Sequence, residues 1–245
     1  MALNYKMTLG WQVAGPTLTE VLRLDAGTGI NYATPPAIGH WDDILISGST
    51  FTAANLSPTS GSDGGGAYVK FSTAGPSAFQ CPTFVQAQPF VIFYIIKATT
   101  NATNNQVFLD SVTGTGRVWI NSPRQPTGYV AAVLDDAFAN VLAGATSVGD
   151  GTAYHLIAMS CGGGTGSLFV HDAATTDGAA NQTIGSSGFN ATNKMQMGAD
   201  YTFNVNSGFN GYLREFRIYS GQGVAGAGGN IDTVMSAMRT KWSLP

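Results

Sequence analysis

The stretch FVIFYIIK, residues 90–97, contains the longest apolar run in this chain of 245 residues. Most of its residues are aromatic or β-branched, and these residue types favour strands. Because apolar residues occupy both the odd and the even positions, both faces of such a strand need cover. The run is less than half as long as the roughly 20 residues that a membrane-spanning helix needs. We therefore predict a central strand in a sheet that is covered on both sides.

Further strand-like segments lie on either side of this run. Residues 194–198 alternate polar and apolar, as a half-buried strand does. The late stretch FNGYLREFRIYSG, residues 209–221, reads as one strand between two glycine turns. Other expected strands are 106–112, 116–121, 154–160 and 167–171, and turn-forming residues separate them at 113–116, 149–151, 162–166 and 186–188. Short strands at this spacing predict a sandwich or a barrel rather than alternating strands and helices.

One helix is expected at the C-terminal end. Asn230 is a good N-cap residue and Asp232 suits the first turn. The apolar residues fall at helical spacing, and they are Ile231, Val234, Met235, Met238 and Trp242. The loop of residues 221–229 has Gly-x-Gly spacing, but the strand–helix–strand context of a dinucleotide site is missing. We therefore interpret this loop as a connection and the helix as a cover for the sheet.

Composition excludes several classes of function. Hydrophobic residues make up 44% of the chain and charged residues only 10%, with 32 glycines and a net charge of −3. The basic residues are scattered, so neither nucleic acid nor a membrane surface is an expected partner. The start of the chain has no charged segment followed by an apolar run, and we expect no secretion signal. Cys81 and Cys161 lie in no metal or redox motif and are expected to be free and buried.

The order of several short motifs resembles one fold family. The motifs are VLRLDA at 21–26, HWDD at 40–43 with Ser47-Gly48, AYVKF at 67–71, QPFVIFY at 88–94, DGTAYHLI at 150–157, and residues 197–199 followed by 209–219. Together they resemble the concanavalin A-like lectin/glucanase superfamily in its LamG-like form, common in bacteriophage and bacterial proteins. Tyr154 stands where tryptophan is more usual. The resemblance covers about residues 17–243.

The resemblance implies an all-β fold, an antiparallel β-sandwich of the concanavalin A-like jelly-roll type with one short C-terminal helix. Residues 16–245 are expected to form a single domain, preceded by an arm of residues 1–15. In such a fold a strand from late in the chain is inserted among early ones. The segment 212–219 is the expected late strand.

Catalysis of glycoside hydrolysis needs two carboxyl groups that flank the scissile bond. The glucanases of the superfamily carry Glu-x-Asp-x-x-Glu or a close variant on one strand, and neither Glu20 nor Glu215 lies in such a motif. Arg214 and Arg217 flank Glu215 and favour an ion pair on the sheet. The chain is therefore predicted not to be an enzyme, and glycoside hydrolase ranks third among its functions.

Two adjacent acid pairs, Asp42-Asp43 and Asp135-Asp136, do not change this prediction. Neighbouring residues of a strand point to opposite faces, so neither pair converges on one substrate atom unless a turn reverses the chain. No catalytic residue is therefore predicted.

Metal ligands are equally scarce. His40, His155 and His171 are far apart in sequence, although the last two lie in strands that can pair. We interpret them as histidines of the sheet rather than ligands, and expect no cofactor. Some domains of this family hold calcium at a loop rim, where Asp200, Asn204 and Asn206 would offer oxygens.

Sugar binding needs exposed aromatic faces beside amide or carboxylate groups. Tyr201 with Asn204 and Asn206 forms one candidate rim, and Trp119 beside Asn121 forms another. Each of them can equally be core or solvated loop.

The function predicted from these features is a non-catalytic structural protein of a bacteriophage virion, such as a surface decoration, cement or fibre-like subunit. It would lie on the virion surface, contact the major capsid protein and form a homo-oligomer such as a trimer. Residues of the arm alternate as a strand would, namely Leu3, Tyr5, Met7, Leu9 and Trp11, and would add a strand to a neighbouring subunit. The alternative is a carbohydrate-binding adhesin or lectin module, because the fold invites glycans without proving that it binds them.

Overall fold

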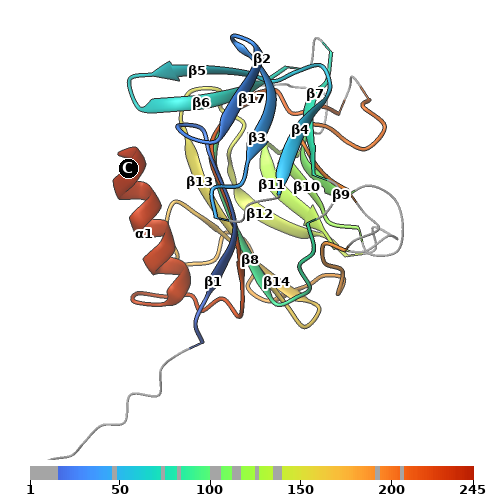
Figure 1. The fold of residues 1–245 in the computed structure, drawn as a ribbon. Coiled ribbons are helices and arrows are strands. Elements are labelled where there is room, and N and C mark those ends of the chain that lie inside the picture. Colours follow the sequence, from blue (N-terminus) through green and yellow to red (C-terminus); the bar gives the residue numbers. More distant parts are fainter. Residues whose placement is uncertain are drawn as a thin grey trace, which may run out of the picture.

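The computed structural model describes residues 16–45, 49–72, 75–81, 84–99, 106–111, 117–124, 127–134, 140–190, 194–204 and 207–245. In these residues the chain forms 17 strands and one helix, and every pairing between strands is antiparallel (Figure 1). The prediction of an all-β jelly-roll sandwich with a C-terminal helix is confirmed. The arm of residues 1–15, the pair Asp135-Asp136 and Asn206 lie outside the described residues, so the assembly predicted through the arm stays a prediction.

The first layer of the sandwich is built around β8. Its strands, in order of pairing, are β15 (Gln182–Thr183), β14 (Thr165–Val170), β13 (His155–Gly162), β8 (Phe90–Ala98), β17 (Gly211–Ser220) and β1 (Thr19–Asp25). The hairpin of β5 (Thr59–Asp63) and β6 (Gly66–Phe71) extends the layer from the beginning of β17. The late strand β17 therefore lies between β1 and β8, as the resemblance implies.

The second layer faces the first across the main hydrophobic core. Its strands, in order of pairing, are β2 (Ile30–Thr34), β3 (Ala37–Asp42), β4 (Thr50–Asn55), β7 (Ser77–Cys81), β16 (Met195–Met197), β9 (Val107–Ser111), β10 (Trp119–Arg124), β11 (Tyr129–Val133) and β12 (Leu142–Ser147). Both cysteines are buried and are not joined in a disulfide. Among the described residues, no helix has the length and apolar character needed to cross a membrane.

Strand β8 is buried on both faces, which confirms the prediction made from its sequence. Four of its side chains enter the core between the layers, namely Phe90, Ile92, Tyr94 and Ile96. The alternate side chains point outward into a second cluster, namely Val91, Phe93 and Ile95. All seven are fully buried because the second layer covers one face and helix α1 (Asn230–Trp242) covers the other (Figure 1).

The helix begins one residue earlier than its predicted cap implies. Gly229 is the N-cap and makes no side-chain cap hydrogen bond, so the prediction of Asn230 as the N-cap is wrong. The Asn230 side chain instead accepts a hydrogen bond from the backbone nitrogen of Val224 at 2.7 Å and donates to the carbonyl oxygens of Pro16 and Gln222. It therefore ties the loop before the helix to the beginning of the described chain.

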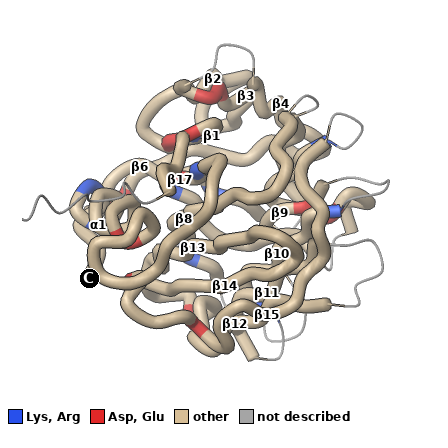
Figure 2. Tube along the Cα trace, turned by 90° about the horizontal axis from the view of Figure 1, so that it is seen from below, with Lys and Arg blue, Asp and Glu red and all other residues tan. Residues whose placement is uncertain are grey.

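A buried carboxylate joins α1 to the sheet. Glu215 of β17 is fully buried and accepts hydrogen bonds from Arg217 Nε at 2.8 Å, Lys241 Nζ at 3.0 Å and the indole nitrogen of Trp242. Lys241 also pairs with Asp25 of β1. The predicted arginine partner is thus Arg217. Charged positions are sparse along the chain (Figure 2), and this cluster joins β1, β17 and α1.

We expect Glu215→Gln to lower the free energy of unfolding by about 3 kcal/mol, because it removes the nearer of the two carboxylates that pair with the buried Arg217 guanidinium and leaves only Glu20, at 3.5 Å. Asp42→Asn, at a half-exposed carboxylate 3.7 Å from His40, is the control and should cost less than about 1 kcal/mol. Urea denaturation of both variants gives the comparison. Equal stabilities of the two variants would show that the hydrogen bonds of Glu215 do not stabilise the docking of α1 on the sheet.

Candidate functional site

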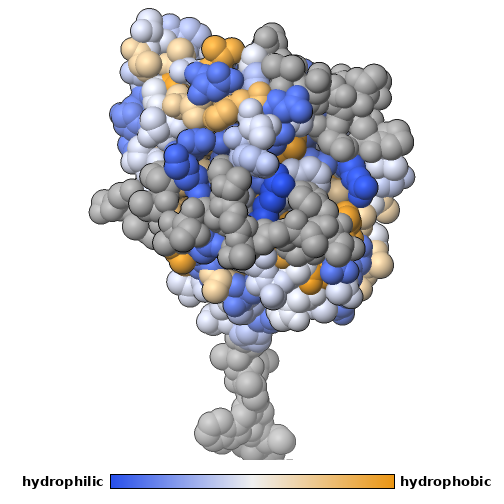
Figure 3. Space-filling view, turned by 90° about the vertical axis from the view of Figure 1, so that its right-hand side faces the viewer, coloured by the Kyte–Doolittle hydropathy of each residue, from blue (hydrophilic) through white to orange (hydrophobic). Residues whose placement is uncertain are grey.

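The structure brings the two aromatic glycan-site candidates, Trp119 and Tyr201, to the same ion pair. Trp119 of β10 lies opposite Asp110 of β9 in the ladder, and the backbone nitrogen of Tyr201 donates to the Asp110 carboxylate at 3.1 Å. Arg117 donates two hydrogen bonds of 2.7 Å to the same carboxylate, and its guanidinium lies 5.1 Å from the centre of the Tyr201 ring. Figure 3 views the molecule from this side, where hydrophilic residues surround scattered apolar ones.

Of the polar partners predicted for these aromatic residues, the structure describes Asn121 and Asn204. Asn121 is fully buried and so cannot meet a ligand beside Trp119. Asn204 is exposed, and its backbone nitrogen donates to the carboxylate of Asp200. Burial raises the pKa of Asp110 although the charge and hydrogen bonds of Arg117 oppose this. The Asp110 carboxylate thus holds both Arg117 and the backbone of Tyr201.

The calcium candidate Asp200 is used inside its own loop. One of its carboxylate oxygens accepts hydrogen bonds from the backbone and hydroxyl of Thr202 and from the backbone of Asn204, and the other accepts from the Ser207 hydroxyl at 2.6 Å. Within the described ranges, no group of three or more His, Cys, Asp and Glu is arranged to hold a metal ion. The loop owes its shape to these hydrogen bonds.

Two of the three histidines do meet. Nδ1 of His155 lies 3.1 Å from Nε2 of His171, and Nε2 of His155 lies 3.1 Å from a carboxylate oxygen of Asp150. Strands β13 and β14 pair, as the sequence suggested, and place both rings at the same end of the hairpin. His40 is on β3, where it lies near Asp42 instead. The row Asp150–His155–His171 is a hydrogen-bonded chain with one end open to solvent.

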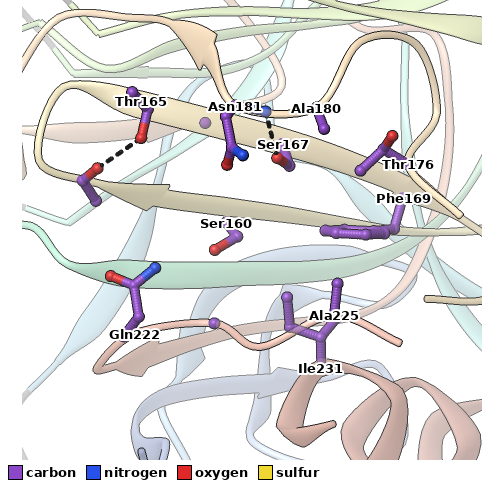
Figure 4. Close-up of a pocket in the computed structure, with 13 residues that line it drawn as sticks. Ser160, Thr165, Ser167, Phe169, Thr176, Ala180, Asn181, Gln222, Ala225 and Ile231 are labelled. Atoms are coloured by element: carbon purple, nitrogen blue, oxygen red, sulfur yellow. Dashed lines mark hydrogen bonds between the residues drawn. The ribbon is translucent and has the colours of Figure 1, made fainter. Parts of the chain in front are cut away.

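A pocket that the sequence did not reveal lies between the β13–β14 hairpin and the loop before α1 (Figure 4). Its volume is about 210 Å³. The ring of Phe169 and the side chain of Ile231 form apolar parts of its wall. Six polar side chains complete the lining, namely Ser160, Thr165, Ser167, Thr176, Asn181 and Gln222. The lining contains hydroxyl and amide groups and no charged residue.

Three of these polar groups have hydrogen-bonding capacity to spare. The side-chain amides of Asn181 and Gln222 and the hydroxyl of Ser160 bond to no other group in the described part of the chain, and all three project into the pocket (Figure 4). Ser167 already accepts a hydrogen bond from the backbone of Asn181, and Thr165 donates to the carbonyl of Gly162. Ser160 is buried, whereas Asn181 and Gln222 are exposed and meet water. These three groups can therefore exchange water for a ligand that offers several donors and acceptors.

Glycines keep this pocket open. A β-carbon at Gly223 would lie 2.4 Å from the Ser160 hydroxyl, and one at Gly162 would lie 2.7 Å from the Gln222 amide oxygen. The hairpin itself turns through Gly163 and Gly164, both with positive φ of 62° and 80°. The glycine-rich stretches that signalled only turns in the sequence therefore also give the space for a ligand. No sequence motif includes both Ser160 and Asn181, so the sequence offered no reason to expect them in one pocket.

The comparisons with known proteins show the fold. The sequence matches no protein-family model and no curated protein. Domain 4 of a GH43 extracellular arabinanase from Geobacillus stearothermophilus, solved with arabinotriose, has a TM-score of 0.61 at 12% identity, over 84% of this chain and 94% of that one. A Trypanosoma rangeli sialidase with difluorosialic acid has a TM-score of 0.60 at 10% identity, over 91% of this chain and 33% of its own.

A third similar structure is that of botulinum neurotoxin type C, described as depending on two ganglioside molecules for cell entry. It has a TM-score of 0.60 at 10% identity, over 90% of this chain and 51% of its own. This chain thus spans about a third of the sialidase and about half of the neurotoxin chain. At such identities the likeness shows a shared β-sandwich and no more.

These comparisons contradict the predicted virion structural protein. The similar structures are an arabinanase domain solved with arabinotriose, a sialidase with difluorosialic acid and a neurotoxin whose cell entry depends on gangliosides, and none of them is a virion or capsid protein. The prediction that the chain is not an enzyme is contradicted too, because the fold occurs within an arabinanase and a sialidase. Low charge and abundant glycine are typical of any turn-rich sandwich, so they do not indicate a virion protein. The missing Glu-x-Asp-x-x-Glu motif excludes only a catalytic pair of acids on one strand.

The histidine pair predicts a pH dependence of stability. Burial lowers the pKa of His171, and the charges of His155 and Arg239 act in the same direction against the weaker opposing effects of Asp172 and Asp150. Below the unfolded value of about 6.5 the unfolded chain therefore takes up a proton more readily than the folded chain. The stability that the neutral ring provides should be lost as the pH falls from 7.5 to 5.5.

The measurement is urea denaturation at several pH values between 7.5 and 5.5. His171→Asn should flatten the dependence, and asparagine tolerates the positive φ of 69° at this position. A wild-type protein equally stable at pH 7.5 and 5.5 would contradict the prediction.

Proposed function

We propose that this chain is a carbohydrate-binding protein that holds one uncharged sugar residue of a glycan in the pocket of Figure 4. The observation that carries this proposal is the set of unused groups of Ser160, Asn181 and Gln222, placed around a cavity with the Phe169 ring in its wall. Among the functions named from the sequence, this is the lectin-like alternative.

The chemistry of the lining suits a sugar. Each sugar hydroxyl both donates and accepts, and a side-chain amide or hydroxyl can answer both roles. The Phe169 ring is only 1% exposed, so it gives the pocket an apolar floor rather than an open face for stacking. Because no charged side chain lines the pocket, no counter-charge exists there for an ionised ligand, and burying one would be costly. These features favour a neutral sugar over an acidic one at this place.

The size of the pocket also limits the ligand. Sites for drug-sized molecules measure roughly 300–1,000 Å³, whereas this cavity measures about 210 Å³. One sugar residue is therefore the natural occupant, with the rest of the glycan outside. The arabinanase domain that shares the fold was solved with arabinotriose, which supports a neutral pentose as the first probe.

The resemblance in sequence and the shared sandwich support a finer assignment. We infer that residues 16–245 form one domain of the concanavalin A-like type in its LamG-like form. Folds of this kind carry many functions, so the assignment supports the glycan-binding proposal only together with the pocket.

A glycan array followed by calorimetry with the best neutral oligosaccharide, starting from arabinotriose, tests the proposal. Asn181→Ala and Gln222→Ala should each weaken binding by about two- to tenfold, since one hydrogen bond contributes about 0.5–1.5 kcal/mol. Asn31→Ala, which removes an exposed amide on β2, is the matched control and should bind as the wild type does.

Two outcomes would overturn the proposal. An array on which no neutral glycan binds would contradict the function itself. Binding that neither pocket variant weakens would show that the sugar lies elsewhere on the molecule.

A further inference from the structure

A row of alternating cations and aromatic rings crosses the outer face of the first layer, beyond the C-terminal end of α1. Side chains 91, 93 and 95 of β8 lie under the helix, so Lys97 continues the same face by the alternation of a strand. In the ladders, Lys97 is opposite Tyr212 of β17, and Tyr212 is opposite Lys70 of β6. Lys70, Tyr212 and Lys97 thus stand side by side on three neighbouring strands.

The distances show that these groups touch. The Lys97 ammonium lies 4.7 Å from the centre of the Tyr212 ring and 4.9 Å from that of Tyr154, just before β13. The Lys70 ammonium lies 5.9 Å from the Tyr212 ring on its other side. Tyr68 meets Tyr212 edge to face at 4.9 Å. Cations at these distances are attracted to the ring faces, which holds the row in place.

The row has a surplus of positive charge. Its nearest carboxylate, Asp63, is already bound to Arg214 at 2.6 Å and to the Tyr154 hydroxyl at 3.0 Å, and Lys97 approaches it only at 4.0 Å. Lys70 is exposed and forms no ion pair within the described residues. Three cations therefore face one committed carboxylate, in a chain whose net charge is −3. This excess of positive charge is local.

Asp63 stays ionised and fixed. Burial by itself would raise its pKa, but hydrogen bonds from Gly65, Arg214 and Tyr154 bring it below its ordinary value. The guanidinium of Arg214 lies flat against Tyr154, 3.6 Å from the ring centre, and 5.5 Å from the Trp242 ring. Asp63 and Arg214 therefore form the rigid support of the row. Lys70 is exposed and remains available to a ligand, and Lys97, whose side chain is 22% exposed and lies 4.0 Å from Asp63, can add a second contact.

We propose that this row, defined by Lys70, Tyr212, Lys97 and Tyr154, binds an anionic saccharide, one that carries carboxylate or sulfate groups. Lys70 and Lys97 are two strands apart, roughly 10 Å, with the half-buried Tyr212 ring between them. A saccharide that spans the row can direct its acidic groups to both ammonium groups, because these lie on either side of Tyr212. The spacing and the aromatic ring favour a saccharide over a simple ion.

This surface is separate from the neutral pocket. Ile231 in the first turn of α1 lines the pocket, whereas Trp242 at the last residue of α1 adjoins Arg214. The two sites therefore lie at opposite ends of the helix, and substitutions can affect them one at a time. The inference does not depend on the proposed function of the pocket.

Binding of a polygalacturonate oligomer and of a sulfated heparin oligomer to the full chain, at increasing sodium chloride, tests the proposal. The double variant Lys70→Gln/Lys97→Gln should bind at least about tenfold more weakly, since hydrogen bonds to charged groups are the stronger ones. The affinity of the wild type should fall as salt rises. Lys194→Gln, at an exposed lysine just before β16, is the matched control and should change nothing.

Tyr212→Leu tests the ring, and it should weaken saccharide binding while melting curves confirm that the variant folds. Asn181→Ala should leave the acidic saccharides bound and thereby separate this site from the pocket. Single-stranded DNA of equal charge should bind more weakly than the saccharide. Equal binding of DNA, an equal loss with Lys194→Gln, an unaffected Tyr212→Leu, or no binding of either acidic probe would each overturn the proposal.

Discussion

The buried carboxylate of Glu215 is the interaction on which the placement of α1 depends. A charge in the interior is tolerated only when hydrogen-bonding partners surround it. Here those partners come from β17 itself, through Arg217, and from the end of the helix, through Lys241 and Trp242. The helix can therefore lie on the sheet in only one position, with its apolar stripe over the outward side chains of β8. Both proposed binding surfaces follow from that position.

The helix divides one sheet face into two surfaces of different character. It has 13 residues, which make a length of about 20 Å. At its beginning, the glycine-rich loop and the β13–β14 hairpin enclose a small uncharged pocket. Beyond its end, lysines and tyrosines stand in an open row. A hollow lined by amides suits a neutral ligand, and an exposed row of cations suits an acidic one.

The functional prediction failed where it relied on composition. Few charges, many glycines and the lack of one acid motif suggested an inert building block. Glycine serves here for tight turns such as that at Gly163 and Gly164 and for free space beside Ser160 and Gln222. Composition does not distinguish these uses. The sequence order also conceals that Asp110 and Arg117 lie between the candidates Trp119 and Tyr201.

Local pattern alone determined much of the architecture. The two-sided apolar run at 90–97 and the apolar stripe of the last helix depend on neighbours a few residues away, and these predictions are confirmed. Residues 195–197 form the expected strand, but Gln196 is fully buried, so the prediction of a half-buried strand is wrong. Only the tertiary structure decided the helix cap at Gly229, the meeting of His155 with His171, and the pocket between Ser160, Asn181 and Gln222. The reason is physical: strand pairing and helix docking bring together groups from distant parts of the chain, and their contacts leave no periodic signal in the sequence.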